Sequence, residues 1–374
     1  MRIGFDAKRA FNNQSGLGNY SRNLLSALYS SYPDFRFILY TPEIKGNLFN
    51  LTGKNFELRT PLKTFHRILP SVWRSFAISG EFKKDMLDVY HGLSHELPSG
   101  IERSGVKSVV TIHDLIFIRY PDLYSTIDRY IYKNKFQFAC KRADKIIAVS
   151  RQTADDIIQY FGTDPSRIDV VYQSCNPGFM GGNIDDEKRQ SVRIKYRLPV
   201  QYILNVGNIE ERKNSLTLIK AVHSAKIDIP VVIIGRKTKY FQRVRKYIDD
   251  NRLKNIHILD TIGNEELPSI YQMADIFVYP SLFEGFGIPI IESLFSGTPV
   301  ITSKGGCFRE AGGPDSIYIN SLDHEELADA IEKVLTDSAL RKQMIESGYH
   351  YAKNFTPEKA ADAMMNVYKQ VVGQ

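Results

Sequence analysis

The stretch PSLFEGFGIPIIESLFSGTPVITS, residues Pro280–Ser303, follows the pattern of one unit of an alternating α/β fold. It continues a short apolar strand, Ile276–Pro280, and passes through a glycine loop that begins at Glu284. An apolar helix is predicted from about Ile288 to Ser296, and another apolar strand follows it. Such strand–loop–helix units build a parallel sheet, in which ligands bind beyond the carboxyl ends of the strands.

The loop joins glycines to two carboxylates. Gly285, Phe286 and Gly287 lie just before the predicted start of the helix, where unpaired backbone amides attract a phosphate and glycine allows it to come close. Glu292 lies one turn inside the helix and is placed to accept hydrogen bonds from a diol such as a ribose, and Glu284 from sugar hydroxyls. A nucleotide sugar fits this pattern. A plain turn followed by an ordinary surface acid is the alternative.

A second segment, VGNIEERKNS, places two cations beside another predicted helix start. Its apolar strand ends at Gly207, Arg212 and Lys213 lie in the polar loop, and a helix begins near Asn214 or Ser215. Because a helix dipole repels cations at this end, the pair is understandable if a diphosphate shares the loop. Two solvated cations paired with the preceding glutamates are the alternative.

Strand and helix patterns alternate along the whole chain, apart from a pause between Asn176 and Pro199. We therefore predict an α/β protein with two Rossmann-like, doubly wound parallel-sheet domains facing across a cleft. The predicted domains are residues 1–180 and 181–356, with the last helix, 357–374, packing back on the first. The predicted strands are Arg2–Asp6, Arg36–Tyr40, Asp88–His91, Ser108–His113, Lys145–Val149, Asp169–Tyr172, Tyr202–Val206, Val231–Ile234, Asn255–Leu259, Ile276–Tyr279, Pro299–Thr302 and Ile317–Ile319.

The composition is that of a globular protein without a membrane span, with 43% hydrophobic and 24% charged residues among 374. The net charge of +7 lies in the first half: residues 1–178 hold 24 basic and 17 acidic side chains, and the remainder holds 25 of each. Three cysteines without metal-ligand spacing suit a reducing cytoplasm. A basic half is compatible with an anionic membrane or a phosphorylated substrate; without a reader motif we expect no nucleic-acid binding.

Together the two motifs resemble the retaining glycosyltransferases of the GT-B fold, family four, also described as glycosyl transferases group 1. The resemblance rests on EGFGIPIIE, in which Glu284 and Glu292 stand at the family's spacing, and on Arg212–Lys213 in VGNIEERKN. It covers the second half closely and the first half more loosely. The family's expected activity is transfer of a hexose from a nucleotide-diphosphate sugar, and mannose is our first choice.

The resemblance also implies roles for individual residues of the second half. Glu284 would contact hydroxyls of the donor sugar, and Glu292 those of the ribose. Arg212 and Lys213 would neutralise the leaving diphosphate, and backbone amides near Phe286–Ile288 would hold its oxygens. Retention would then need no enzymic nucleophile, because the acceptor oxygen attacks from the face that the diphosphate leaves.

The resemblance also assigns candidates in the first half. Gly16 and Gly18 match the family's first glycine-rich loop, between the first strand and the first helix, although a plain turn is nearly as good an interpretation. His113, at a strand end in VVTIHDL, would reach the donor sugar; a histidine bonded to local backbone is the alternative.

The segment VYHGLSHELP adds His91, Ser94 and His95 as candidates for the acceptor side. The acceptor itself is expected to be a glycan or a lipid-linked sugar in the synthesis of a surface polysaccharide or lipopolysaccharide. The donor is expected to be a GDP- or UDP-hexose.

No cofactor or metal is expected. The sequence lacks the Asp-x-Asp motif with which glycosyltransferases of the other major fold hold a divalent ion, and Arg212 and Lys213 can supply the same charge. Two other functions stay open: a sugar-nucleotide epimerase, which would release nucleotide without an acceptor, and a non-catalytic sugar-nucleotide-binding protein, which would show no slow hydrolysis.

Residues Pro61–Asp85 mix basic and aromatic side chains and suggest a peripheral contact with an anionic membrane, at the inner face of the cytoplasmic membrane. The alternative is an amphipathic helix whose apolar side lies in the core.

Overall fold

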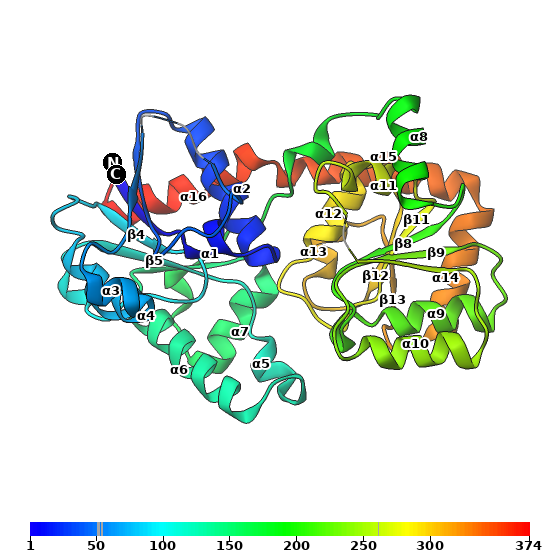
Figure 1. Cartoon of the computed structure of the whole chain (residues 1–374), viewed down its shortest axis with the longest axis horizontal. Coiled ribbons are helices and arrows are strands. Elements are labelled where there is room, and N and C mark those ends of the chain that lie inside the picture. Colours follow the sequence, from blue (N-terminus) through cyan, green and yellow to red (C-terminus); the bar gives the residue numbers. More distant parts are fainter. Residues whose placement is uncertain (51–52, 54, 261) are drawn as a thin grey trace. The chain divides into compact units, whose positions relative to one another are not determined.

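The computed structural model describes residues 1–50, 53, 55–260 and 262–374. It divides into two compact units, one formed by Met1–Ser174 with Phe355–Gln374 and the other by Cys175–Asn354. The boundary at Ser174 lies close to the expected residue 180. The last helix belongs to the first unit, so the chain returns to that unit at its end (Figure 1).

Each unit is built on one parallel sheet, with strand orders β3-β2-β1-β4-β5-β6-β7 and β10-β9-β8-β11-β12-β13. Both orders reverse direction in the middle, between β1 and β4 and between β8 and β11, as in doubly wound folds. This confirms the predicted fold class. The strands are β1 (Arg2–Asp6), β2 (Arg36–Tyr40), β3 (Phe56–Arg59), β4 (Val89–Gly92), β5 (Lys107–Ile112), β6 (Lys145–Ala148), β7 (Ile168–Val170), β8 (Ile203–Val206), β9 (Val231–Ile234), β10 (Ile256–Leu259), β11 (Ile276–Tyr279), β12 (Val300–Ser303) and β13 (Ile317–Ile319).

Helices cover both faces of the first sheet. On one face α2 packs against α16 over a core that includes Phe5, Phe37 and Met364. On the other, α6 and α7 cover Ile112 and Ile146 (Figure 1). The helices of this unit are α1 (Lys8–Asn12), α2 (Gly16–Ser31), α3 (Thr64–Ile68), α4 (Pro70–Val72), α5 (Ile116–Arg119), α6 (Thr126–Arg142), α7 (Arg151–Phe161) and α16 (Pro357–Val372).

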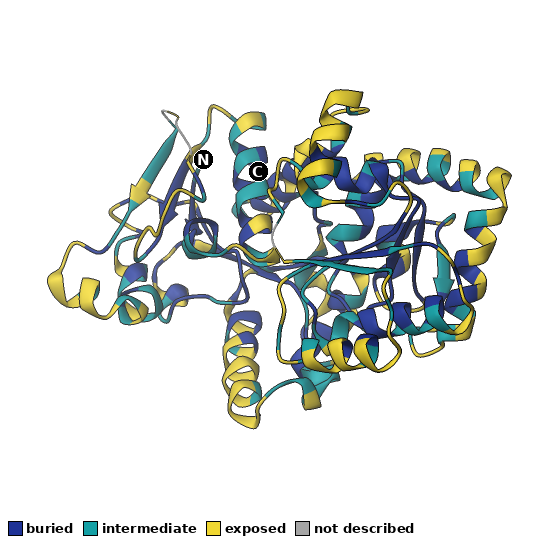
Figure 2. Cartoon of the chain, turned by 45° about the vertical axis from the view of Figure 1, so that its right-hand side comes forward, coloured by how far each residue is buried: buried dark blue, intermediate teal, exposed yellow. Residues whose placement is uncertain are grey.

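In the second unit α9, α10 and α14 lie on one face of the sheet, and α11, α12 and α15 on the other (Figure 1). The central strands are buried on both faces, which explains their unbroken apolar sequences (Figure 2). The helices are α8 (Asp186–Tyr196), α9 (Ser215–Ser224), α10 (Phe241–Asp250), α11 (Leu267–Met273), α12 (Ile288–Phe295), α13 (Phe308–Gly312), α14 (His324–Thr336) and α15 (Ser338–Ala352).

Three local predictions need correction. The helix α1 and the edge strand β3 were not expected, because both are short: α1 is about one turn long and β3 has four residues. Gly16 and Gly18 lie in the first turn of α2, not in a loop before it. The segment from Pro61 is not one amphipathic helix: α3 ends at Ile68, α4 begins at Pro70, and a π-helical turn follows.

Candidate active site

The second unit brings Arg212, Lys213 and Glu284 together beyond the carboxyl ends of β8 and β11. Arg212 Nη1 and Lys213 Nζ each lie 2.7 Å from Glu284 Oε1. Tyr279, the last residue of β11, donates its hydroxyl to the same oxygen at 3.0 Å. The second Arg212 nitrogen, Nη2, lies 2.8 Å from Glu210. Two cations and two carboxylates therefore form a neutral, largely buried cluster.

The backbone around β8 explains how these side chains meet. Gly207 has φ of 153°, a conformation that favours glycine, and the aliphatic stem of Lys213 packs over it. A 3₁₀ turn, Glu211–Lys213, then leads to Asn214 in the left-handed region. The Asn214 side chain does not cap α9 but donates to the carbonyls of Pro280 and Ser321. Asn214 thereby ties the loop after β8 to the loop after β11.

The electrostatics of the cluster depend on its burial. Burial by itself raises the pKa of Glu284, but the charges of Arg212 and Lys213 outweigh it and lower that pKa to about 2. Burial lowers the pKa of Lys213, and the Glu284 carboxylate opposes this change. The alternative of two solvated surface cations is therefore wrong, because both side chains are mostly buried and share a buried carboxylate.

The glycine loop ends where α12 begins, as the sequence predicts. Gly287 occupies the cap position with φ of 106°, and Pro289 lies in the first turn of the helix. Cys307 donates its buried thiol to the carbonyl oxygens of Glu284 at 3.2 Å and Phe286 at 3.0 Å. The thiol thus ties the loop to the segment after β12, and this contact was not foreseen from the sequence.

Glu292 lies in the second turn of α12 and is half-buried. The hydroxyl of Tyr271 donates to Glu292 Oε2 at 3.1 Å. Burial raises the pKa of Glu292 to about 7, although the hydrogen bond from Tyr271 opposes that increase. Glu292 is therefore not an ordinary surface acid: near neutral pH it holds its proton about half of the time.

His113 follows β5 in the first unit and is buried with both ring nitrogens occupied. Nε2 lies 2.9 Å from the carbonyl of Leu93, so Nε2 holds the hydrogen, and Nδ1 accepts from the Gln173 amide at 3.0 Å. Burial lowers the pKa of His113 to about 4, which keeps the ring neutral. In this conformation neither nitrogen is available to a sugar, and Gln173 would have to move first.

The acceptor-side candidates differ from one another. His91 is fully buried, and its nitrogens lie 2.6 Å from the Tyr368 hydroxyl and 2.8 Å from the Thr111 hydroxyl, so it joins β4 to α16. His95, with φ of 63°, stacks on Phe136 at 4.2 Å. These contacts favour structural roles for both histidines.

Ser94 is buried too, but its hydroxyl makes no hydrogen bond within the described part of the chain. Among these three residues, Ser94 keeps the hydrogen-bonding capacity that an acceptor would use.

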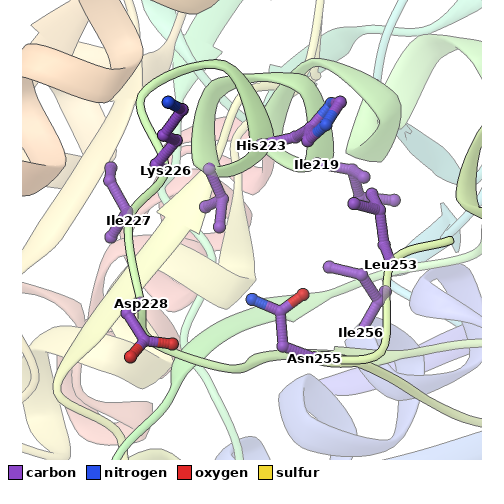
Figure 3. A pocket seen from close by; sticks show the side chains of 9 residues that line it. Ile219, His223, Lys226, Ile227, Asp228, Leu253, Asn255 and Ile256 are labelled. Atoms are coloured by element: carbon purple, nitrogen blue, oxygen red, sulfur yellow. The ribbon is translucent and has the colours of Figure 1, made fainter. Parts of the chain in front are cut away.

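A cavity of about 300 Å³ lies elsewhere in the second unit (Figure 3). It is lined by residues of the middle and end of α9, including Ile219 and His223, and by Leu253 and Ile256. Ile256 is the first residue of β10, so this cavity is at the amino edge of the sheet, opposite the Lys213 and Glu284 cluster. It is separate from the candidate site.

Among residues 1–50, 53, 55–260 and 262–374, no group of three or more histidine, cysteine, aspartate or glutamate side chains is arranged to hold a metal ion. In the same part of the chain, no helix has both the length and the apolar character that crossing a membrane requires.

Comparison with solved structures identifies the class of fold. The chain matches a glycosyltransferase from Rickettsia africae with a TM-score of 0.76 at 19% identity, over 99% of this chain and 98% of that one. It matches Anabaena Alr3699/HepE in complex with UDP and glucose with a TM-score of 0.76 at 16% identity, over 99% and 100%. The match to WaaG, a glycosyltransferase involved in lipopolysaccharide biosynthesis, has a TM-score of 0.72 at 18% identity and covers 100% of each chain. The two sheets are those of the GT-B fold.

The family models are more specific. "Glycosyl transferases group 1" matches residues 186–351, and "Glycosyltransferase Family 4" matches residues 14–178. The chain therefore belongs to the group 1, family 4-like glycosyltransferases, and the resemblance noted from its motifs is confirmed.

Curated relatives include O-antigen mannosyltransferases. The O-antigen chain mannosyltransferase B of Escherichia coli is 28% identical over 288 residues, which cover 75% of this chain and 74% of that protein. The serotype-specific mannosyltransferase WbdA of E. coli is 28% identical over 247 residues, and this match spans only 30% of its length. The O-antigen chain mannosyltransferase RfbU of Salmonella typhimurium is 29% identical over 60% of each chain.

Proposed function

We propose that this glycosyltransferase moves a hexose, mannose in the first instance, from a nucleotide-diphosphate sugar to a glycan or lipid-linked acceptor with retention of the anomeric configuration. The reaction would take place in the cytoplasm and serve the synthesis of a surface polysaccharide or lipopolysaccharide. The observation that supports this most is the convergence of Arg212 and Lys213 beside the glycine loop, at the point where the strand order of the second sheet reverses.

The chemical argument starts from the leaving group. When the bond between the sugar and the diphosphate breaks, negative charge develops on the diphosphate oxygens. Arg212 and Lys213 are held in place before the reaction by Glu284, Tyr279 and Glu210, so they need no reorganisation to stabilise that charge. The amides at the start of α12 would bind further oxygens, because the unpaired N–H groups of a helix N-terminus attract anions.

Glu284 would position the cations and meet hydroxyls of the donor sugar, and Glu292 would accept hydrogen bonds from the ribose. The acceptor hydroxyl would form its bond to the anomeric carbon on the face from which the diphosphate departs. Its proton would pass to an oxygen of that diphosphate, so no enzymic nucleophile is needed.

The experiment that tests the function combines binding with product analysis. The chain is screened by thermal shift against GDP, UDP and ADP and their hexose conjugates, and each binding conjugate is then incubated with and without a lipid-linked glycan acceptor. We expect one diphosphate series to stabilise the chain and the new linkage to keep the donor's anomeric configuration. Three results would each contradict the proposal. They are inversion at that carbon, release of an epimerised donor, and donor binding that is followed by neither transfer nor slow hydrolysis.

The pKa of Glu292 predicts a pH dependence of nucleotide binding. A ribose diol donates hydrogen bonds better to an ionised carboxylate, and Glu292 loses its proton as the pH rises through about 7. Between pH 6 and pH 8 the affinity for the nucleoside diphosphate should therefore rise by up to about ten-fold. In Glu292→Gln this rise should disappear. Only the pH dependence that comes from ionisation of the phosphate groups should remain, and it is measured separately from the binding of inorganic pyrophosphate. An identical pH profile in the two proteins would rule out a contact between Glu292 and the ribose.

We also propose that transfer needs no divalent metal, because Arg212 and Lys213 supply the positive charge. Activity measured in excess EDTA should equal that measured with added Mg²⁺ or Mn²⁺ within about two-fold. This difference is much smaller than the loss of activity expected when one contact that stabilises the leaving group is removed. Loss of activity in EDTA that is restored by Mn²⁺ would contradict this expectation.

A further inference from the structure

Two hydroxyl side chains at the end of β12 bind carbonyls of the neighbouring segment after β11. Thr302 Oγ1 donates to the carbonyl oxygen of Tyr279 at 2.8 Å, and Ser303 Oγ donates to that of Ser281 at 2.6 Å. Because a buried carbonyl without a donor is costly, these bonds fix the course of the chain where it leaves the sheet. The segment that continues into α13 thus comes to lie beside the glycine loop, and α12 and α13 are neighbours (Figure 1).

Cys307 continues this arrangement along the glycine loop. It precedes α13, is fully buried, and contacts the carbonyl oxygens of Glu284 and Phe286 through its thiol. A thiol has one hydrogen, so the two carbonyls share it. Burial and the nearby Glu284 carboxylate raise the pKa of Cys307, so the thiol keeps its hydrogen and remains a donor. Two carbonyls of the loop therefore point toward one side chain.

The direction of these carbonyls determines the direction of the amides that follow them. In a planar trans peptide group the N–H points opposite to the C=O, and no peptide bond among the described residues is cis. Since the carbonyl of Phe286 points toward Cys307, the amide of Gly287 points the other way. Within the described part of the chain, neither this amide nor that of Ile288 has a hydrogen-bond acceptor, and Pro289 has no amide hydrogen. Two donors at the start of α12 are thus left for a ligand.

Glycine makes this orientation dependent on an outside contact. Gly287 has φ of 106°, and glycine can adopt many other backbone conformations at little cost, so its own residue type does not fix the peptide. Gly287 also lies close to α13, because a Cβ placed on it would be 3.8 Å from the Cβ of Ala311. Cys307 and α13 are therefore the parts of the fold that can hold the Phe286–Gly287 peptide in one orientation.

We propose that Cys307 is a positioning residue for the diphosphate site: its thiol holds the Phe286–Gly287 peptide so that the Gly287 amide faces the diphosphate oxygens of the sugar nucleotide. The inference rests on the proposed function, in which the start of α12 binds that diphosphate. Cys307 does not touch the substrate; it acts through the backbone of the glycine loop.

The Gly287 amide can be observed directly by nuclear magnetic resonance. Phe-Gly pairs occur in the sequence at Phe161–Gly162 and Phe286–Gly287 and nowhere else. A chain labelled with ¹³C at the phenylalanine carbonyl and with ¹⁵N at glycine therefore gives two carbonyl-selected amide signals. Gly162 caps α7 in the first unit, where its amide donates to the preceding turn, and it serves as the internal control. Inorganic pyrophosphate should shift the Gly287 signal and leave the Gly162 signal in place.

Four substitutions separate the hydrogen bond from the volume of the side chain. Cys307→Ser and Cys307→Thr keep a hydroxyl donor, whereas Cys307→Ala and Cys307→Val are their counterparts without one. The Ala and Val variants should bind pyrophosphate about ten-fold more weakly than the wild type and lose most of the Gly287 shift. The Ser and Thr variants should stay within about three-fold of the wild type and keep the shift. Cys140→Ala, a control at a buried cysteine of α6, should bind as the wild type does.

Two results would overturn the role of Cys307. One is pyrophosphate affinity in Cys307→Ala and Cys307→Val equal to that of the wild type. The other is an equal loss in the variants with and without a hydroxyl, because the volume of the side chain and not its hydrogen bond would then matter. Thermal unfolding without ligand shows which variants fold, and the Thr and Val pair decides the question if Cys307→Ala does not.

The same measurements distinguish this inference from the proposed function. A wild-type chain that binds neither pyrophosphate nor a nucleoside diphosphate would contradict both. A Gly287 shift that depends on Cys307, in a chain that transfers no hexose, would contradict only the proposed function.

Discussion

Replacing Lys213 with methionine should lower the turnover rate of sugar transfer by about 100- to 1,000-fold, the loss typical when one preorganised contact to a developing negative charge is removed. Methionine keeps the length and most of the volume of the side chain but supplies no charge. Lys213 is the better choice for this test because Arg212 also donates to the carbonyl of Phe283 at 2.7 Å and so supports the loop. The rate is measured at saturating donor, so that a change in donor affinity does not obscure the effect.

The control is Lys246→Met, since Lys246 is an exposed lysine of α10 paired with Asp250 at 2.7 Å. It should leave the rate unchanged. If Lys213→Met kept more than about a third of the wild-type rate, the leaving diphosphate would not depend on this cation, and the proposed role of the cluster would be wrong.

Replacing Glu284 with glutamine should lower the free energy of unfolding of the second unit by about 3 kcal/mol. The reason is that Arg212 and Lys213 would stay buried without their shared carboxylate, and unpaired buried charge is costly. Urea unfolding followed by far-UV circular dichroism measures the loss. Glu346→Gln, which removes an exposed partner of Lys342, should cost less than about 1 kcal/mol.

Ligand and pH give two further measurements on the same variant. A nucleoside diphosphate should raise the midpoint of thermal unfolding more in Glu284→Gln than in the wild type, because the anion replaces the missing charge. The folded-state pKa of Glu284 is about 2, below its ordinary value of 4.5, so its stabilisation is present above pH 4.5. The difference between variant and wild type should therefore shrink as the pH falls from about 4.5 towards 2. A difference that does not change over this range would contradict the ion-pair explanation.

The sequence was most informative about the strands, because the same apolar pattern repeats at almost every strand along the chain. All twelve predicted strands match strands of the structure within one or two residues, because buried parallel strands are short apolar runs between turns. The strand that was missed, β3, lies at the edge of its sheet and has no buried side chain, so its sequence lacks that signal. Gly16 and Gly18 were misplaced because a glycine pair is equally compatible with a loop and with the start of a helix.

The contacts of the candidate site were less accessible. Tyr279 and Tyr271 were not singled out, because as strand and helix residues they look like ordinary core side chains. Only the fold places their hydroxyls against Glu284 and Glu292. The pairing of His113 with Gln173 likewise joins residues 60 positions apart, and no local pattern indicates it.

By itself the sequence determined the order of strands and helices, the family, and which polar residues follow strand ends, since these depend on local periodicity and on short motifs. The tertiary structure alone decided that Lys213 and Glu284, 71 residues apart, share a buried ion pair, and that the apolar side chains near Phe65 face the solvent. The physical reason is that burial and charge pairing depend on which segments pack together, and a parallel sheet brings distant strand ends to one edge.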